Sequence, residues 1–183
     1  CLAGCWGDYP AAEAARNADV ILAIGARFSD LHCASWLPGY TYNIPPTKLI
    51  HVDIDAGEIG RNYPAHLGIL GDARASLDVM IRLIRARPRG QGKGYGDWLA
   101  KLRECRKIWD DYQDQFSGSE QVPLRPERLM KGLSRVVPEH AIFATDVGVH
   151  HNWVIQLWAS RRPRYLLQSW GFACMGYATS GIL

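Results

Sequence analysis

Residues 19–24, Asp-Val-Ile-Leu-Ala-Ile, form an apolar run that stops at a glycine and predicts a short buried strand. Before it, Pro10 stands where a first helical turn tolerates proline, and residues 11–17 contain mainly strong helix formers. Two further strands are predicted at residues 49–54, which contain β-branched side chains, and at residues 69–70. Short strands that alternate with helices predict an α/β layer fold.

The third predicted strand leads into a helix. Asp72 can cap this helix, and its apolar side chains fall on one face: Leu77, Met80, Ile81 and Ile84. Residues 85–97 then lose that periodicity and carry glycines and like charges, which favour a solvated linker over an anion-binding run. We therefore expect a boundary there, with one domain at residues 1–87, a linker at 88–97 and a second domain at 98–183.

The alternation of helix and strand starts again after the linker. Aromatic and apolar residues recur every three or four positions over residues 98–112 and predict a helix that buries one stripe. A helix that starts with proline is expected at residues 126–136, strands at 141–145 and 165–167, and a helix rich in tryptophan after Gly148. The whole chain is thus expected to form parallel-sheet, Rossmann-like layers in two incomplete domains.

The composition argues against several classes of protein. Of the 183 residues 48% are hydrophobic, and the formal charge of +3 is too small to indicate a nucleic-acid partner. No apolar run approaches the roughly 18 residues of a membrane span, and the start lacks the pattern of a signal peptide. The five cysteines contain no CxxC pair, which favours reduced thiols and a soluble, cytoplasmic protein. Because both Cys1 and the apolar end at Leu183 look cut, we expect a piece of a longer chain.

Two segments carry the residues best suited to chemistry. Residues 146–153, Asp-Val-Gly-Val-His-His-Asn-Trp, lie between a predicted strand and a predicted helix, where helix N–H groups favour an anion. Gly148 would let a phosphate approach the backbone, and His150 could add a donor. Taken alone, a glycine and a histidine pair equally describe an ordinary helix start.

The second segment is residues 168–177, Gln-Ser-Trp-Gly-Phe-Ala-Cys-Met-Gly-Tyr, at another predicted junction of strand and helix. A flat heterocycle could pack against Met175, whose side chain is adaptable and polarizable, while neighbouring backbone groups bind its edge. The alternative for this segment is ordinary core packing.

Together, in order and at this separation, the two segments resemble the start of the diphosphate-binding domain of thiamine-diphosphate enzymes, especially acetolactate synthase. The family's V-G-Q-H-Q-M-W corresponds to V-G-V-H-H-N-W at residues 147–153, and its S-G-G-L-G-T-M-G to S-W-G-F-A-C-M-G at residues 169–176. Val149 replaces a glutamine, and Trp170 and Ala173 replace glycines. These changes bear on the reaction more than on the cofactor.

The resemblance implies roles for individual residues. Val147, Gly148 and His150 would lie at the diphosphate, whereas Ala173 and Met175 would hold the aminopyrimidine.

The first half of the chain is similar to the central domain of the same family, through residues 18–28, 51–55, 58–60 and 71–73. In acetolactate synthases this region binds FAD, and the matching positions would be Gly25, Ala26, Arg27, Asp53, Glu58, Asp72 and Ala73. An arginine can pair with a diphosphate, and carboxylates at strand ends can accept ribose hydroxyls. The alternative is that the aspartates only cap strand ends.

FAD is left open for this chain. The family's G-x-R-F-D-D-R appears as G-A-R-F-S-D-L at residues 25–31, and its L-G-M-H-G as A-G-C-W-G at residues 3–7. Many relatives also keep this domain without the flavin.

The resemblance further implies an enzyme of branched-chain amino acid biosynthesis that decarboxylates a 2-keto acid such as pyruvate and joins the remaining unit to a second carbonyl compound. The family's activating glutamate and its magnesium ligands lie in segments outside these residues, so no catalytic or metal-binding residue is assigned. We expect this chain to be inactive by itself. Because family sites form between two subunits, a homodimer or homotetramer is expected.

Other functions remain open. On the same scaffold, the reaction could be that of another decarboxylase, a carbon–carbon lyase or the trihydroxycyclohexanedione hydrolase of inositol breakdown. A non-catalytic nucleotide-binding domain is a further alternative, although no G-x-G-x-x-G follows the first strand. A truncated gene product without activity is the third.

Overall fold

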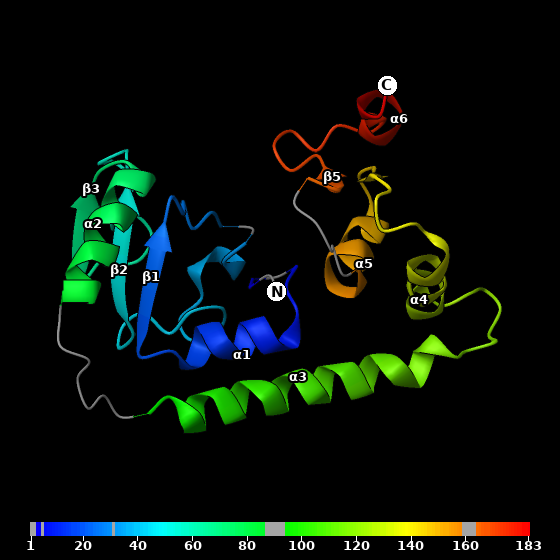
Figure 1. Cartoon of the computed structure of the whole chain (residues 1–183), viewed down its shortest axis with the longest axis horizontal. Coiled ribbons are helices and arrows are strands. Elements are labelled where there is room, and N and C mark those ends of the chain that lie inside the picture. Colours follow the sequence, from blue (N-terminus) through cyan, green and yellow to red (C-terminus); the bar gives the residue numbers. More distant parts are fainter. Residues whose placement is uncertain (1–2, 5, 31, 87–93, 159–163) are drawn as a thin grey trace. The chain divides into compact units, whose positions relative to one another are not determined.

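The computed structural model describes residues 3–4, 6–30, 32–86, 94–158 and 164–183. The chain divides into two compact units, here called the N-terminal unit, built on Tyr9–Cys105, and the C-terminal unit, built on Arg106–Leu183 together with Trp6–Asp8 (Figure 1). The boundaries expected at residues 87 and 98 stay a prediction, and residues 88–93 of the expected linker lie outside the described residues.

The N-terminal unit is an open parallel sheet with helices. Its elements in chain order are α1 (Tyr9–Asn17), β1 (Val20–Ile24), the 3₁₀ turn η1 (Ala34–Trp36), β2 (Lys48–Asp53), β3 (Leu67–Leu70) and α2 (Ala73–Ala86). The strands lie side by side in the order β1-β2-β3, and all pairs are parallel. Because Ile24 pairs with Val52 and Asp53 with Leu70, the carboxyl ends of the three strands meet at one edge. The predicted α/β class is confirmed.

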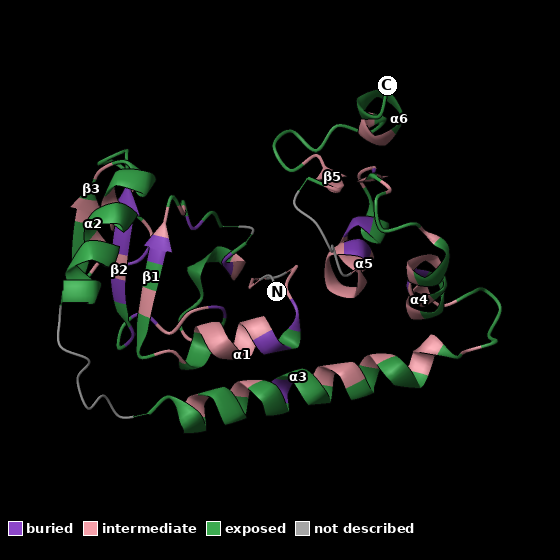
Figure 2. Cartoon of the chain, viewed as in Figure 1, coloured by how far each residue is buried: buried purple, intermediate pink, exposed green. Residues whose placement is uncertain are grey.

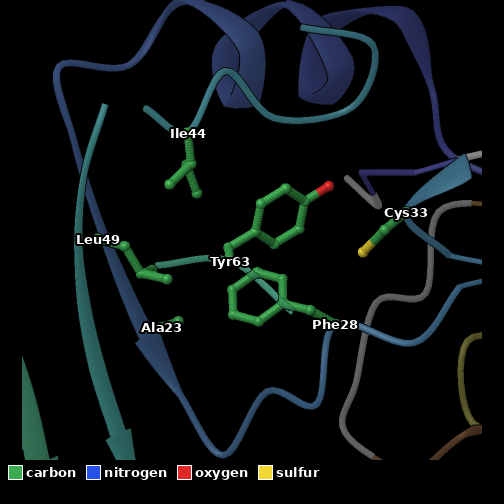
Figure 3. Close-up of a cluster of buried hydrophobic side chains, with 6 residues drawn as sticks. All are labelled: Ala23, Phe28, Cys33, Ile44, Leu49 and Tyr63. Atoms are coloured by element: carbon green, nitrogen blue, oxygen red, sulfur yellow. The ribbon is translucent and has the colours of Figure 1, made fainter. Parts of the chain in front are cut away.

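One face of this sheet carries the core. Figure 3 shows Ala23 and Leu49 from the strands together with Phe28, Cys33, Ile44 and Tyr63 from the loops. The Phe28 ring meets the rings of three neighbours edge to face, at centroid distances of 5.4 Å: Tyr42, His51 and Tyr63. The loops after β1 and β2 therefore pack as part of the core and not as free connections.

The other face of the sheet is buried at its centre, where Val52 is 0% exposed, but thinly covered at the edge strand β1. Val20 and Leu22 of β1 are about half exposed, and none of the residues of α2, all of which the structure describes, is buried. Figure 2 shows α2 mainly in the colour of exposed residues. The apolar face predicted for α2 is present in the sequence, but in this chain it stays largely open to solvent.

The C-terminal unit repeats the alternation on a smaller scale. It contains α4 (Pro126–Val136), β4 (Phe143–Thr145), α5 (Val149–Leu157), β5 (Leu166–Gln168) and α6 (Tyr177–Gly181). The strands β4 and β5 are parallel, with Phe143 opposite Leu166 and Thr145 opposite Gln168. Their carboxyl ends bring the two segments predicted to carry chemistry to one edge.

The long helix α3 (Gly96–Ser117) differs from its prediction in two ways. It starts at Gly96, inside the expected linker, and Asp97 in its first turn suits the positive end of the helix dipole. Of its expected stripe only Cys105 is buried, whereas Tyr112 is exposed. None of the helices that the structure describes is long and apolar enough to cross a membrane.

Candidate cofactor-binding sites

The first candidate segment forms the turn from β4 into α5. Gly148 is the N-cap residue of α5, and its φ of 155° lies in the region that favours glycine. A Cβ at this position would lie 2.9 Å from atoms of the His150 ring. Among the residues that the structure describes, no side chain caps α5, so the amides of its first turn face no side-chain acceptor. This end of the helix is suited to an anion.

The second candidate segment joins β5 to α6. Its apolar side chains point into solvent, because Met175 is 87% exposed and Phe172 is 97% exposed. Two residues have left-handed backbones, Ala173 with φ 49° and Gly176 with φ 91°. Ala173 stands where the family motif has glycine, which tolerates this conformation without a Cβ penalty.

Asp146 connects the two segments. Its carboxylate accepts the backbone N–H of Val147 at 2.7 Å, that of Gly176 at 2.9 Å and that of Ala178 at 3.3 Å. The amide of Val147 lowers the pKa of Asp146 most, the amides of Gly176 and Ala178 lower it further, and His150 adds a smaller attraction. No role for Asp146 was predicted from the sequence. An aspartate directly after a strand is too common a pattern to indicate such a contact.

His151 and Trp170 form a second contact between the segments. The imidazole of His151 is buried, and its Nε2 has no hydrogen-bond partner in the described part of the chain. Burial lowers the pKa of His151, and His150 lowers it further, so the neutral ring is favoured. Neither residue matches the family motif, which has glutamine and glycine at these positions.

The positions predicted for FAD lie around the carboxyl edge of the larger sheet. Gly25, Ala26 and Arg27 follow β1, Asp53 ends β2, Glu58 lies in the turn beyond it, and Asp72 and Ala73 follow β3. The topology thus brings these strand ends together, as the prediction requires.

The carboxylates at this edge also have structural partners. Asp53 accepts the backbone N–H of Asp55 at 2.9 Å, and Asp72 accepts that of Ala75 at 2.9 Å, which confirms that Asp72 caps α2. Glu58 pairs with Arg61 at 3.0 Å, but its Oε2 is buried without a hydrogen-bond partner among the described residues. Both aspartates therefore bind backbone N–H groups at the ends of their strands, as the alternative to a ligand role requires. Their role in binding a ligand stays a prediction.

His51 holds the loop that carries Arg27. Its Nδ1 accepts the backbone N–H of Gly60 at 3.3 Å, so its Nε2 carries the proton and donates to the carbonyl of Ala26 at 2.9 Å. Asn62 adds a bond of 3.0 Å to the carbonyl of Arg27. The side chain of Arg27 itself is exposed. Neither His51 nor Asn62 was predicted to have this role, because a histidine inside a strand and an asparagine in a loop give no distinct signal in the sequence.

A metal site is the remaining possibility for acidic and histidine side chains. Within the described ranges, no group of three or more histidine, cysteine, aspartate or glutamate side chains is placed to hold a metal ion.

Comparison with known proteins finds one matching domain family and several similar enzymes. The model for "thiamine pyrophosphate enzyme, central domain" matches residues 2–80. An acetolactate synthase of Mycobacterium bovis is 33% identical over 178 residues, which are 97% of this chain and 28% of that protein. A probable acetolactate synthase large subunit of Methanocaldococcus jannaschii is 33% identical over 96% of this chain and 29% of its own length. Acetolactate synthase 3, chloroplastic, of Brassica napus is 30% identical over 96% of this chain and 26% of its own length.

The chain thus spans less than a third of the length of these relatives. Both comparisons point to the same kind of enzyme. Residues 2–80 match the central domain of thiamine pyrophosphate enzymes, and nearly the whole chain is similar to part of the acetolactate synthases.

Proposed function

We propose that these residues are part of a thiamine-diphosphate-dependent enzyme that decarboxylates a 2-keto acid such as pyruvate and joins the remaining unit to a second carbonyl compound. The similarity to acetolactate synthases over 97% of the chain supports this reaction. One structural observation carries the cofactor site: the two predicted segments meet, because Asp146 binds the amide of Gly176, 30 positions further along the chain.

The residues of this chain have separate tasks in the proposal. The uncapped first turn of α5, which follows Val147 and Gly148 and contains His150, binds the diphosphate through its N–H groups and the helix dipole. Ala173 and Met175 hold the aminopyrimidine, and the exposed thioether of Met175 supplies an apolar support for a flat ring. Thiamine diphosphate, when bound, supplies the electron sink for loss of carbon dioxide.

The exposed state of Met175 and Phe172 also supports an oligomer. Two large apolar side chains at one junction have no cover within the described residues, and a second subunit would supply it. We therefore propose that the protein forms a homodimer or a homotetramer. The magnesium ligands and the activating glutamate would come from other segments, and the reduced cysteines fit a cytoplasmic setting.

For the N-terminal unit we propose FAD as a second ligand, at Gly25, Ala26, Arg27, Asp53, Glu58, Asp72 and Ala73. The observation that favours it is the meeting of these strand ends beside Arg27, whose exposed guanidinium makes no ion pair with any described residue. A guanidinium in this position can pair with a diphosphate. The visible absorbance of the purified protein tests this: a flavin spectrum supports the site, and its absence after reconstitution with FAD contradicts it.

The main proposal is tested on the protein isolated from its natural source, here called the native-length protein. Intact mass defines that length first. Calorimetric titration with thiamine diphosphate and Mg²⁺ should show saturable binding, and pyruvate should then be consumed with release of carbon dioxide. Titration with NAD is the control, because saturable NAD binding without thiamine diphosphate binding would instead support the non-catalytic nucleotide-binding domain.

The 183-residue chain itself is a second control. We expect it to consume no pyruvate, even with both the cofactor and magnesium. Turnover by this chain alone would overturn the proposal that other segments complete the site.

A further inference from the structure

The connection from β5 to α6 is long and poorly covered. Residues 169–176 contain no helix or strand, and those from 170 to 176 are all exposed. This connection nevertheless carries Ala173 and Met175, the residues proposed to hold the aminopyrimidine. A segment with so few buried contacts needs a specific tie if its residues are to be ordered before a ligand arrives.

Asp146 is such a tie at the far end of the connection. Gly176, the residue next to Met175, donates its N–H to both carboxylate oxygens of Asp146, at 2.9 and 3.0 Å. Ala178 adds a third N–H at 3.3 Å. The near end of the connection is held separately, by the contact of Trp170 with His151.

The same carboxylate is anchored to the other segment. Asp146 follows β4 directly, and its Oδ1 accepts the N–H of Val147, one residue before Gly148. The carboxylate is therefore shared between the start of the proposed diphosphate site and the end of the proposed aminopyrimidine site. A charged acceptor with several N–H donors makes stronger bonds than a neutral one would.

The backbone of Gly176 is shaped for this contact. Its φ of 91° turns the chain so that α6 begins at the next residue, Tyr177. A left-handed conformation is available to glycine without a Cβ penalty, so the turn that presents this N–H depends on the glycine. The position of Met175 is therefore fixed by one glycine turn and one carboxylate.

We propose that Asp146 is a positioning residue that sets the distance between the two halves of the thiamine diphosphate site. Asp146 does not touch the cofactor. It holds the backbone at Met175 at a fixed distance from Val147 and Gly148. The residues that support the aminopyrimidine are then already in position when the diphosphate of the cofactor binds. This inference rests on the proposed function for its ligand, but the tie itself exists without a ligand.

Two variants of the native-length protein test the proposal, Asp146→Ala and Asp146→Asn. Asp146→Ala removes every acceptor, whereas Asp146→Asn keeps one carbonyl oxygen. Asp111→Asn is the matched control, because among the described residues Asp111 makes only an exposed ion pair, with Lys107 on α3. Hydrogen exchange is followed at the amides of Gly176 and Ala178 without ligand, and binding is measured for thiamine diphosphate and for inorganic pyrophosphate, each with Mg²⁺.

For Asp146→Ala we expect exchange at both amides to speed up by about tenfold to a hundredfold, the range for losing bonds to a charged group. Thiamine diphosphate should bind about tenfold or more weakly, whereas pyrophosphate, which needs only the first segment, should weaken much less, because only the N–H of Val147 loses its acceptor there. Asp146→Asn should fall between the two, and Asp111→Asn should change nothing.

Other outcomes overturn the inference. Unchanged exchange in Asp146→Ala would show that the tie does not order the connection. Equal weakening of both ligands would indicate general loss of structure, and no weakening of thiamine diphosphate would remove the positioning role. Failure of the wild type to bind thiamine diphosphate would sink the proposed function instead, while the exchange data would still decide whether the tie exists.

Discussion

The imidazole of His151 stacks on the indole of Trp170, with ring centroids 4.4 Å apart and an angle of 29° between the planes. Both residues depart from the family motif, which has glutamine and glycine there. Because the two side chains that differ from the motif contact each other, we interpret them as a coupled pair of substitutions. In this pair, the ring of Trp170 packs against the ring of His151. The pair joins the proposed diphosphate segment to the proposed aminopyrimidine segment.

A double-mutant cycle over His151→Gln and Trp170→Gly should reveal this coupling. Each single change leaves one ring without its partner, whereas the double variant restores the family's pair. We expect a coupling free energy of about 0.5–1.5 kcal/mol, the range for aromatic pairs. Urea unfolding of the native-length protein measures it, and strictly additive effects would show that the two departures are independent.

Replacing Ala173 by glycine should stabilise the protein. Ala173 has φ 49°, and a left-handed conformation costs a residue with a Cβ about 1 kcal/mol. Relief of this strain outweighs the larger chain entropy of glycine in the unfolded state, so we expect a gain of about 0.5 kcal/mol in the free energy of unfolding. Ala178→Gly, inside α6, is the matched control and should have the opposite sign. Destabilisation by Ala173→Gly would contradict the strain.

The stability of the protein should depend on His151 below about pH 6.5. Burial lowers the pKa of His151 from 6.5, so the unfolded chain binds a proton that the folded protein rejects. The contribution is fully present above pH 6.5 and is lost as the pH falls toward the folded-state pKa. Urea unfolding at several pH values should show this slope in the wild type.

The matched variants for this pH effect are His151→Gln and His140→Gln. His151→Gln should flatten the slope, whereas His140→Gln, which changes an exposed histidine outside the candidate segments, should leave it in place. An equal slope in wild type and His151→Gln would assign the pH dependence to other groups.

Local sequence patterns predicted the elements well. The bounds of α4 are those expected from its proline start, and the strands differ from their predictions by one or two residues, as strand ends commonly do. The meeting of Gly25 and Asp53 at one edge followed from parallel strands alone. These features depend on neighbours in the sequence or on the rule that parallel strands share an edge.

The contacts that order the sites could not be predicted in the same way. Asp146 binds an amide 30 positions away, and His51 joins Ala26 to Gly60 across two loops. Propensity and periodicity predict whether a residue suits its own helix or strand. They do not predict which distant backbone N–H will form a hydrogen bond with its side chain. The solvent exposure of the apolar face of α2 could not be predicted for the same reason. Amphipathic spacing predicts that a helix has an apolar face, but it does not predict which element covers that face.

Replacing His51 should disturb the N-terminal unit more than its single polar ring suggests. The ring is 1% exposed, and it makes two hydrogen bonds and an edge contact with Phe28. His51→Ala leaves a cavity and two partly buried backbone groups without partners, for an expected loss of about 3 kcal/mol or more. His66→Ala, at an exposed histidine just before β3, is the control and should stay within about 0.5 kcal/mol. Similar losses in both variants would contradict the proposed link between the loops.

Gly148→Ala tests whether the start of α5 is built for an anion. The new Cβ would lie 2.9 Å from the His150 ring, and the φ of 155° suits no residue with a side chain. His150 would have to move, and the first amides of α5 would move with it. We therefore expect binding of inorganic pyrophosphate to weaken about tenfold, at a cost in stability of about 1–3 kcal/mol.

Gly171→Ala separates this effect from the loss of any glycine nearby. A Cβ at Gly171 would meet nothing within 4 Å, so this variant should bind pyrophosphate as the wild type does. Calorimetric titration of both variants compares them directly. If Gly148→Ala kept its affinity for pyrophosphate while losing stability, Gly148 would serve only the turn. The anion would then bind elsewhere, and the first half of the proposed cofactor site would have to be placed on other residues.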